Sequence, residues 1–248
     1  MWAKMALIEI QDITKSFGGL KAVDHFDMKI EDGQIVGLIG PNGAWKSTLF
    51  NLITGVFSVD SGQIVFNGEN ITNGKPYQIC RKGIGRSFQT VKPFSDMTVI
   101  DNVMVGALCR VERPKEARQQ AMEVLEFVKL DEKRNFLTKN LTIADKKCLE
   151  LARALATKPK LLLLDEVMAG LNPKETEDTI SLVRRIQENG ITLLIIEHVM
   201  RVIMTLPERI SIIHHGKKIA EGIPQEVAAD ERVIKAYMGE RYVVTRAS

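Results

Sequence analysis

The sequence predicts an α/β fold with a mainly parallel sheet, and three observations support this prediction. Residues 34–55 have the pattern of a buried strand, a glycine-rich turn and a helix, in that order. Two later apolar runs, over 160–166 and 191–196, have the pattern of buried strands that end in polar side chains. A mostly helical stretch over 98–155 separates the first strand from the other two. We therefore expect an α/β domain that carries a helical insertion.

The turn after the first of these strands has the features of a phosphate-binding loop. Gly40, Gly43, Lys46 and Ser47 stand at the required spacing before a helical run that stops at Gly55. Free backbone N–H groups at a helix N-terminus face an anion there, and the lysine adds a full positive charge. The alternative is an ordinary glycine-rich turn with a chance Lys-Ser pair. The expected phosphate contacts are Gly40, Pro41, Asn42, Gly43, Ala44, Trp45, Lys46, Ser47 and Thr48.

One residue departs from the motif. Trp45 stands where the pattern has a glycine, directly before Lys46. Glycine lets a backbone approach a ligand closely because it has no Cβ. A tryptophan at this position must point its ring away from a bound nucleotide, or it obstructs that nucleotide.

Composition agrees with a globular, enzyme-like chain. The 248 residues are 45% hydrophobic, which is enough for a sizeable core, and the formal net charge of +3 calls for no nucleic-acid partner. The first residues hold no apolar signal core, and no apolar run approaches the roughly 20 residues that cross a bilayer. The three cysteines form no metal pair and no even disulfide set, which suits a reducing cytoplasm. We expect any membrane role to depend on a partner.

The N-terminal third contains strands on either side of the loop. Residues 6–13 and 20–30 alternate as strands do, and a further strand is expected over 61–68, followed by a helix from Pro76 to Lys82. Phe17, in the turn between the first two strands, is either a platform for a base ring or a core aromatic. Gln89 ends the next strand, where it either contacts Mg²⁺ or the attacking water, or is a polar surface residue.

The helical stretch has its own pattern. Helices are expected from Thr98 onward, over 116–129 and over 149–156. We expect a helical subdomain over 90–157 inserted into a single domain of 1–248, whose core comes from 1–89 and 158–248. Three apolar residues of the loop after Gln89 either face a partner or pack beneath the helices: Val91, Phe94 and Met97.

The α/β pattern then resumes. Asp165 and Glu166 end a buried strand, and the carboxyl end of a parallel strand is where ligands bind. Asn172 is the expected cap of a helix that begins with Pro173 and runs to Glu188. The next strand ends at Glu197 and His198. We expect Glu197 to be an exposed charge. His198 is either a functional residue or a polar residue that caps the end of the strand. A hairpin over 210–220 and a helical tail over 224–239 complete the chain.

The combination of these motifs resembles the ATP-binding cassette family, the nucleotide-binding subunits of ABC transporters. In its terms, 40–48 is similar to the Walker A loop, Gln89 to the Q-loop, 141–145 to the signature segment, 161–166 to the Walker B strand and His198 to the switch histidine. Several segments resemble the ATPases of branched-chain amino-acid importers: 17–23, 86–89, 169–173, 195–198 and 236–239.

The resemblance implies a P-loop NTPase core with an N-terminal antiparallel β-subdomain and an inserted α-helical subdomain. It implies ATP and Mg²⁺ as cofactors and hydrolysis of ATP, with Lys46 on the phosphates and Mg²⁺ held by Ser47, Gln89 and Asp165. Glu166 is then the general base, and His198 contacts the γ-phosphate and orients the water. Thr142 and Ala144 are expected to act on the nucleotide of a second subunit.

The implied partners are that second ATPase subunit, identical or a sister chain, and integral membrane permease subunits. The implied place is the cytoplasmic face of the cell membrane, with membrane contact only through the permease.

Some residues depart from the family pattern. Besides Trp45, the signature segment carries Ala144 and Asp145, whose negative charge is unfavourable near phosphates. Val167 and Val199 replace a usual proline and a common aspartate. Three hypotheses follow: an active amino-acid importer ATPase; an impaired or engineered cassette with weak ATP binding and a structural role; and a soluble ABC ATPase without a permease.

Overall fold

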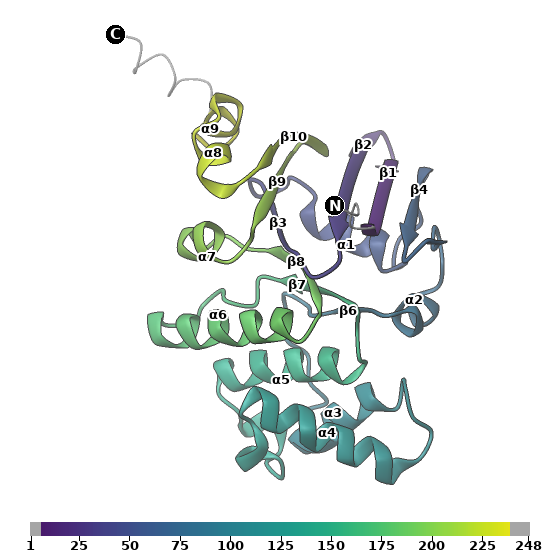
Figure 1. The fold of residues 1–248 in the computed structure, drawn as a ribbon, viewed down its shortest axis with the longest axis vertical. Helices are drawn as coiled ribbons and strands as arrows, with labels where there is room; N and C mark the ends of the chain where they lie inside the picture. The colour runs from purple at the N-terminus through teal and green to yellow at the C-terminus, as the bar shows by residue number, and fades with distance from the viewer. Residues whose placement is uncertain (1–5, 239–248) are drawn as a thin grey trace, which may run out of the picture. The chain divides into compact units, whose positions relative to one another are not determined.

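The structure, a computed structural model, describes residues 6–238. The chain forms two compact units, one from residues 1–76 and 192–248 and the other from residues 77–191 (Figure 1). Each unit contains strands and helices. The first unit holds the described elements β1 (Ala6–Phe17), β2 (Leu20–Glu31), β3 (Ile35–Ile39), α1 (Lys46–Ile53), β4 (Ser61–Phe66), β5 (Glu69–Asn70), β8 (Thr192–Ile196), α7 (Met200–Thr205), β9 (Arg209–His214), β10 (Lys217–Gly222), α8 (Pro224–Ala228) and α9 (Glu231–Met238).

An antiparallel sheet of the first unit has the strand order β2-β1-β4-β5. The strands β1 and β2 form a hairpin whose turn passes through Gly18, at a φ of 58° that favours glycine. This sheet is the antiparallel β-subdomain that the resemblance implies. Its first strand runs on to Phe17, four residues beyond the predicted end, because pairing with β2 continues up to the turn.

A second set of strands in this unit positions the phosphate loop. The strand β3 lies between β8 and β9 and is parallel to both, while β10 is antiparallel to β9. All residues of β3 and β8 are buried, as their continuous apolar sequences predict. Because β3 and β8 are parallel, the loop that follows Ile39 and the segment that follows Ile196 leave the same edge of the sheet.

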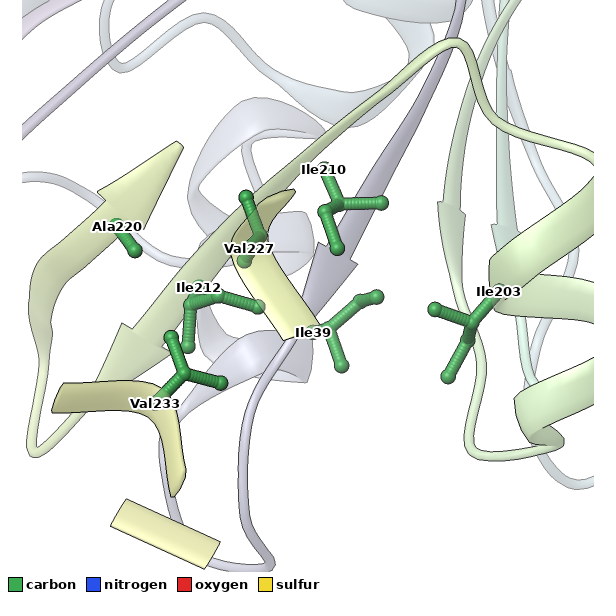
Figure 2. Close-up of a cluster of buried hydrophobic side chains, with 7 residues drawn as sticks. All are labelled: Ile39, Ile203, Ile210, Ile212, Ala220, Val227 and Val233. Atoms are coloured by element: carbon green, nitrogen blue, oxygen red, sulfur yellow. The ribbon is translucent and has the colours of Figure 1, made fainter. Parts of the chain in front are cut away.

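A hydrophobic cluster joins this edge to the C-terminal helices (Figure 2). Its members come from β3, β9, β10 and α7–α9: Ile39, Ile203, Ile210, Ile212, Ala220, Val227 and Val233. The tail, predicted to be helical, consists of two helices, because α8 ends at Ala228 and Asp230 starts a new turn by accepting a hydrogen bond from the Arg232 backbone N–H. Gly239, the predicted end, lies outside the described residues.

The second unit is mainly helical around two parallel strands. It contains α2 (Pro76–Lys82, whose first residue belongs to the first unit), β6 (Ile84–Arg86), α3 (Val99–Ala107), α4 (Pro114–Val128), the 3₁₀ turns Asp131–Lys133 and Thr138–Asn140, α5 (Ile143–Ala156), β7 (Leu161–Asp165) and α6 (Pro173–Glu188). The strands β6 and β7 pair in parallel. Helices α3, α4 and α5 pack against one another (Figure 1). A Cβ on Gly106 of α3 would lie 2.4 Å from the Arg153 carbonyl oxygen of α5, so this packing needs glycine.

Two helices begin at residues whose side chains cap them. Asn172 caps α6 in a capping box with Glu175, and the helix runs to Glu188 as predicted. Helix α5 begins at Ile143, six residues before the predicted start, because the Thr142 hydroxyl accepts a hydrogen bond from the Asp145 backbone N–H. Most of the segment 141–145 is therefore a helix start.

Two of the three cysteines are neighbours in this unit. Cys80 of α2 and Cys109, just after α3, have their sulfur atoms 3.7 Å apart. Among residues 6–238, no helix has the length and apolar character needed to span a bilayer.

Candidate functional site

The loop between β3 and α1 has a backbone that only its glycines allow. A Cβ on Gly40 would lie 2.1 Å from the Ile213 carbonyl oxygen, so no other residue fits there. Gly43 has a φ of 79°, and a Cβ on it would meet no atom within 4 Å, so this side of the loop is open. Pro41 and Ser47 are half-buried, Asn42 is exposed, and Ala44 and Thr48 are buried. The loop therefore presents its open side through Asn42 and Gly43.

The lysine of the loop is held inside it. Lys46 is only 7% exposed, and its Nζ donates hydrogen bonds to the carbonyl oxygens of Gly40 at 2.7 Å and Pro41 at 3.0 Å. A buried ammonium needs such acceptors, since its desolvation is otherwise costly. Phosphate oxygens are stronger acceptors for the same ammonium group. The loop thus carries a positive charge that an entering anion can recruit.

The side chain of Trp45 lies on another aromatic residue. Its backbone is left-handed, with a φ of 72° and a ψ of 23°, as the glycine of the motif would be. Its ring stacks on that of Phe17, with the ring centroids 6.3 Å apart and the planes at 27°. Phe17 in turn meets the edge of Phe57 at 5.3 Å. Since Phe17 is 38% exposed, it is not a core aromatic.

At the end of β8 the two polar residues differ in burial. His198 is exposed and follows the strand at the same sheet edge as the phosphate loop. The prediction that Glu197 is an exposed charge is wrong, because its side chain is only 2% exposed. Glu197 directly follows β8, whose residues are all buried, and the burial extends one residue beyond the end of the strand.

In the second unit, Asp165 ends β7 in a buried ion pair. The carboxylate is 2% exposed and lies 3.1 Å from the Arg86 guanidinium at the end of β6. Burial lowers the pKa of Arg86, although the charge of Asp165 and their hydrogen bond oppose this. The Asp165 backbone N–H also donates to the Ser87 hydroxyl. These contacts fix the predicted metal ligand to the strand that leads into Gln89.

Gln89 and Glu166, both predicted site residues, are in contact. The Gln89 side-chain amide donates to the Glu166 carboxylate at 2.7 Å. Glu166 has a φ of 52°, an uncommon backbone conformation for this residue type. Such conformations persist where neighbouring contacts impose them.

Lys147 is a residue of this region that sequence reasoning missed. Its ammonium donates to the carbonyl oxygens of Glu166, at 3.0 Å, and Ala169. It therefore holds both ends of the segment that follows β7. No sequence signal indicated this role, because Lys147 lies in the first turns of α5 and the helix was predicted to begin only at Leu149.

Comparison with known proteins decides the family. A family model described as "ABC transporter" matches residues 23–169, more than half of the chain. The chain belongs to the ATP-binding cassette family of transporter ATPases. A second model, "Branched-chain amino acid ATP-binding cassette transporter", matches residues 217–243.

Named relatives span nearly all of this cassette. The high-affinity branched-chain amino acid transport ATP-binding protein BraF of Pseudomonas aeruginosa is 38% identical over 252 residues, covering 94% of this chain and 98% of that protein. The corresponding protein LivG of Escherichia coli is 35% identical over 250 residues, with the same coverage.

Solved cassettes share the fold. A crystal structure of a nucleotide-free ATP-binding cassette from an ABC transporter has a TM-score of 0.88 at 33% identity, covering 95% of this chain and 100% of that one. A cassette solved in its ADP conformation has a TM-score of 0.86 at 34% identity, with the same coverage. The P-loop NTPase fold is thereby confirmed.

In this cassette, the signature segment caps a helix. Besides accepting the Asp145 N–H, the Thr142 hydroxyl donates to the Asp145 carboxylate at 2.8 Å. Lys133 Nζ lies 2.7 Å from both carboxylate oxygens of Asp145. Burial would raise the pKa of Asp145, but the bonds from Lys133 and Thr142 outweigh it and lower that pKa. The negative charge that seemed unfavourable near phosphates is thus paired within the second unit. Ala144 is half-buried.

The other departures and the loop after Gln89 have ordinary packing. Val167 is buried and Val199 is half-buried just before α7. Val91 and Met97 are half-buried, whereas Phe94 is 45% exposed and carries the Arg153 guanidinium 5.0 Å from its ring centre.

Each of the predicted Mg²⁺ ligands carries a hard oxygen donor. A hydroxyl, an amide oxygen and a carboxylate, from Ser47, Gln89 and Asp165, are donors of the type that Mg²⁺ prefers. Within the described part of the chain, no group of three or more His, Cys, Asp or Glu side chains is placed to hold a metal. The donor chemistry of each of these three residues fits Mg²⁺.

Proposed function

We propose that this ABC-type ATPase drives the import of branched-chain or other amino acids. The proposal is supported by the two family descriptions, one of them specific to branched-chain amino-acid transporters, and by the names of BraF and LivG. The observation that carries the nucleotide role is the loop with a buried, carbonyl-bound Lys46 beside an open Gly43.

The loop residues 40–48 hold the triphosphate in this proposal. Lys46 exchanges its bonds to Gly40 and Pro41 for bonds to the β- and γ-phosphates, and the loop amides add further donors. Phe17 contacts the base. The exchange is favourable because a charged acceptor forms a stronger hydrogen bond with an ammonium than a carbonyl does.

Ser47, Gln89 and Asp165 would hold Mg²⁺, which supplies charge neutralisation on the phosphate oxygens. Glu166 accepts the proton of the attacking water, and Gln89, which bonds its carboxylate, orients it. His198 donates to the γ-phosphate and positions the water. Arg86 fixes the Asp165 carboxylate through the ion pair between them.

The assembly follows from the same family membership. A second ATPase subunit supplies Thr142 and Ala144 to this subunit's nucleotide, and membrane permease subunits dock on the helical subdomain. Phe94, which is exposed, is the main proposed contact for the permease, and the half-buried Val91 and Met97 contribute less. The chain would lie at the cytoplasmic face of the membrane and bind no nucleic acid.

The base assignment is tested with Glu166→Gln. We expect kcat to fall about 100-fold or more, because general base catalysis contributes at least that much, while Mg·ATP affinity persists. Sedimentation should show an ATP-dependent dimer of this variant. The control is Glu188→Gln, at the exposed end of α6. Unchanged turnover in Glu166→Gln removes Glu166 from the role.

The transport assignment is tested in Escherichia coli cells that lack LivG. Expression of this chain should restore uptake of radiolabelled leucine, and expression of the Glu166→Gln variant should not. A chain that co-purifies with the permease subunits yet restores no uptake of any branched-chain amino acid would argue against the proposed solute class.

A further inference from the structure

The aromatic contact between Trp45 and Phe17 lies directly beside the lysine of the phosphate loop. We infer that the Trp45 indole is a base-contacting residue, which together with Phe17 makes nucleotide affinity depend on an aromatic base. The inference rests on the proposed ATP site and adds to it a residue that the loop motif does not contain.

The ring of Phe17 is held in place on several sides. The edge of Phe57 lies 5.3 Å from it, and the Lys15 ammonium lies 5.5 Å from its centroid. Lys15 is itself fixed by Asp60 at 2.8 Å. These contacts support the Phe17 ring beside which the Trp45 indole lies. A preorganised surface binds a flat ligand without first ordering its own side chains.

The indole leaves the phosphate side of the loop clear. The Lys46 ammonium and the carbonyls of Gly40 and Pro41 occupy the interior of the loop, and Gly43 borders open space. The Trp45 ring lies on Phe17 instead. Of the two alternatives for this residue, the contact with Phe17 favours a ring directed away from the phosphates.

The chemistry of the pair fits a nucleobase. Indole and phenyl faces stack on any base because every base has a π-face, and the contact is tolerant of base identity. The Lys15 ammonium near Phe17 adds a cation at the same place. Trp45 precedes the first residue of α1, and its backbone has a φ of 72°. Glycine adopts this backbone conformation at no steric cost. The ligand class is thus a nucleoside triphosphate bound by its base as well as its phosphates.

The test compares ligands with and without a base. In a Trp2→Phe background, where Trp45 is the remaining tryptophan of the two in the chain, calorimetry measures the Kd of Mg·ATP and of Mg·tripolyphosphate. Trp45→Ala removes the ring but keeps a Cβ at the same φ, and Trp45→Phe keeps a ring. We expect Trp45→Ala to weaken Mg·ATP about tenfold, the scale of one base stack, and to leave tripolyphosphate within a factor of two.

Two further variants and a fluorescence measurement test whether the aromatic ring itself is responsible. Trp45→Phe should bind Mg·ATP within about threefold of the parent, since a phenyl also stacks. Phe136→Ala, which removes a ring that is 52% exposed in the second unit, should change neither affinity. Indole fluorescence of the Trp2→Phe protein should change with Mg·ATP and not with tripolyphosphate.

Three results overturn the inference. Equal loss of ATP and tripolyphosphate affinity in Trp45→Ala would mean that Trp45 only shapes the loop. Tighter ATP binding in that variant would mean that the indole obstructs the base. Unchanged affinity for both ligands would mean that the indole touches neither. Failure of the parent protein to bind either ligand would instead refute the proposed ATP site.

Discussion

Two residues beside the proposed chemistry, Trp45 and Glu166, have left-handed backbones, with φ values of 72° and 52°. For residues with a Cβ this conformation costs on the order of 1–3 kcal/mol each. Neighbouring side chains account for both. The Trp45 ring rests on Phe17, and Glu166 is held at its carbonyl by Lys147 and at its carboxylate by Gln89. The geometry of each residue therefore depends on partners distant in sequence.

Lys147→Met should disturb the segment after β7. The variant loses the hydrogen bonds to the carbonyl oxygens of Glu166 and Ala169, so we expect the free energy of unfolding to fall by about 1–3 kcal/mol. We also expect kcat to fall while the KM for ATP changes little, because the loss affects the orientation of the proposed base. Denaturant titration and steady-state kinetics measure the two effects.

The neighbouring residue supplies the control for that variant. Lys146→Met removes an adjacent lysine whose Nζ makes only a 3.5 Å contact with the Lys139 carbonyl, so it should change little. If both variants lose kcat equally, the specific contacts of Lys147 are not the cause.

At the scale of an element, α5 shows how the signature segment is stabilised. Thr142 caps the helix, and Asp145 lies in its first turn, where a negative charge is favoured by the helix dipole. We expect Thr142→Ala to lower the free energy of unfolding by about 1 kcal/mol and Thr142→Ser to lower it by much less, since serine keeps the capping hydroxyl. Thermal or urea unfolding measures this, and equal losses in the two variants would show that the methyl group matters instead.

The ion pair of Asp145 makes part of the stability depend on pH. Its pKa is lowered in the folded chain from an ordinary value of 3.8, so its contribution is present above 3.8 and is lost as the pH falls through the lower, folded value. Asp145→Asn should therefore be less stable than the parent by roughly 0.5–1 kcal/mol at neutral pH, and the difference should shrink in acid.

Urea unfolding from pH 7 down to pH 2 measures that difference. Lys133→Met, which removes the partner of Asp145, should reduce the pH dependence in the same range. A difference between parent and Asp145→Asn that stays constant with pH would contradict the assignment.

The bounds of a helix were predicted correctly where the residues that start and end it are local sequence signals. The helix α6 was predicted to the residue because Asn172, Pro173 and the final Asn-Gly pair are local signals. The start of α5 was missed because Thr142 was interpreted as part of a ligand motif. The tail was predicted to be helical, and its division into two helices was not predicted because Asp230 looks like an ordinary polar residue. Burial of Glu197 depends on elements that cover the chain beyond the end of β8, and no local sequence signal reveals them.

For the whole molecule, the predicted site residues divide between the two units. The loop 40–48 and His198 belong to the first, and Gln89, Asp165 and Glu166 to the second. Their motifs were visible in sequence because each is a short run next to a strand. Arg86 and Lys147, which hold Asp165 and Glu166, were assigned no such roles because each acts on a partner at least 19 positions away.

Ligand binding should raise the stability of the chain. At a free Mg·ATP concentration 100 times its Kd, we expect the free energy of unfolding to rise by about 2.7 kcal/mol, because the ligand binds only the folded state. Lys46→Ala should remove most of this increase, and adenosine without phosphates should reproduce little of it. Urea unfolding with and without ligand provides the measurement. An equal increase in Lys46→Ala would contradict the role of the loop lysine.

The neighbouring sulfur atoms of Cys80 and Cys109 have a practical consequence for anyone who purifies this protein. A mild oxidant such as diamide can take two electrons and two protons from the pair and leave a covalent crosslink between α2 and the end of α3. Burial raises the pKa of Cys80, so little thiolate exists at neutral pH and the crosslink should form faster as the buffer becomes more alkaline. Cys148, whose pKa burial raises to about 12, should stay reduced in peptide maps of the same samples. Stocks kept without a reducing agent would then drift into a mixture of two chemical species.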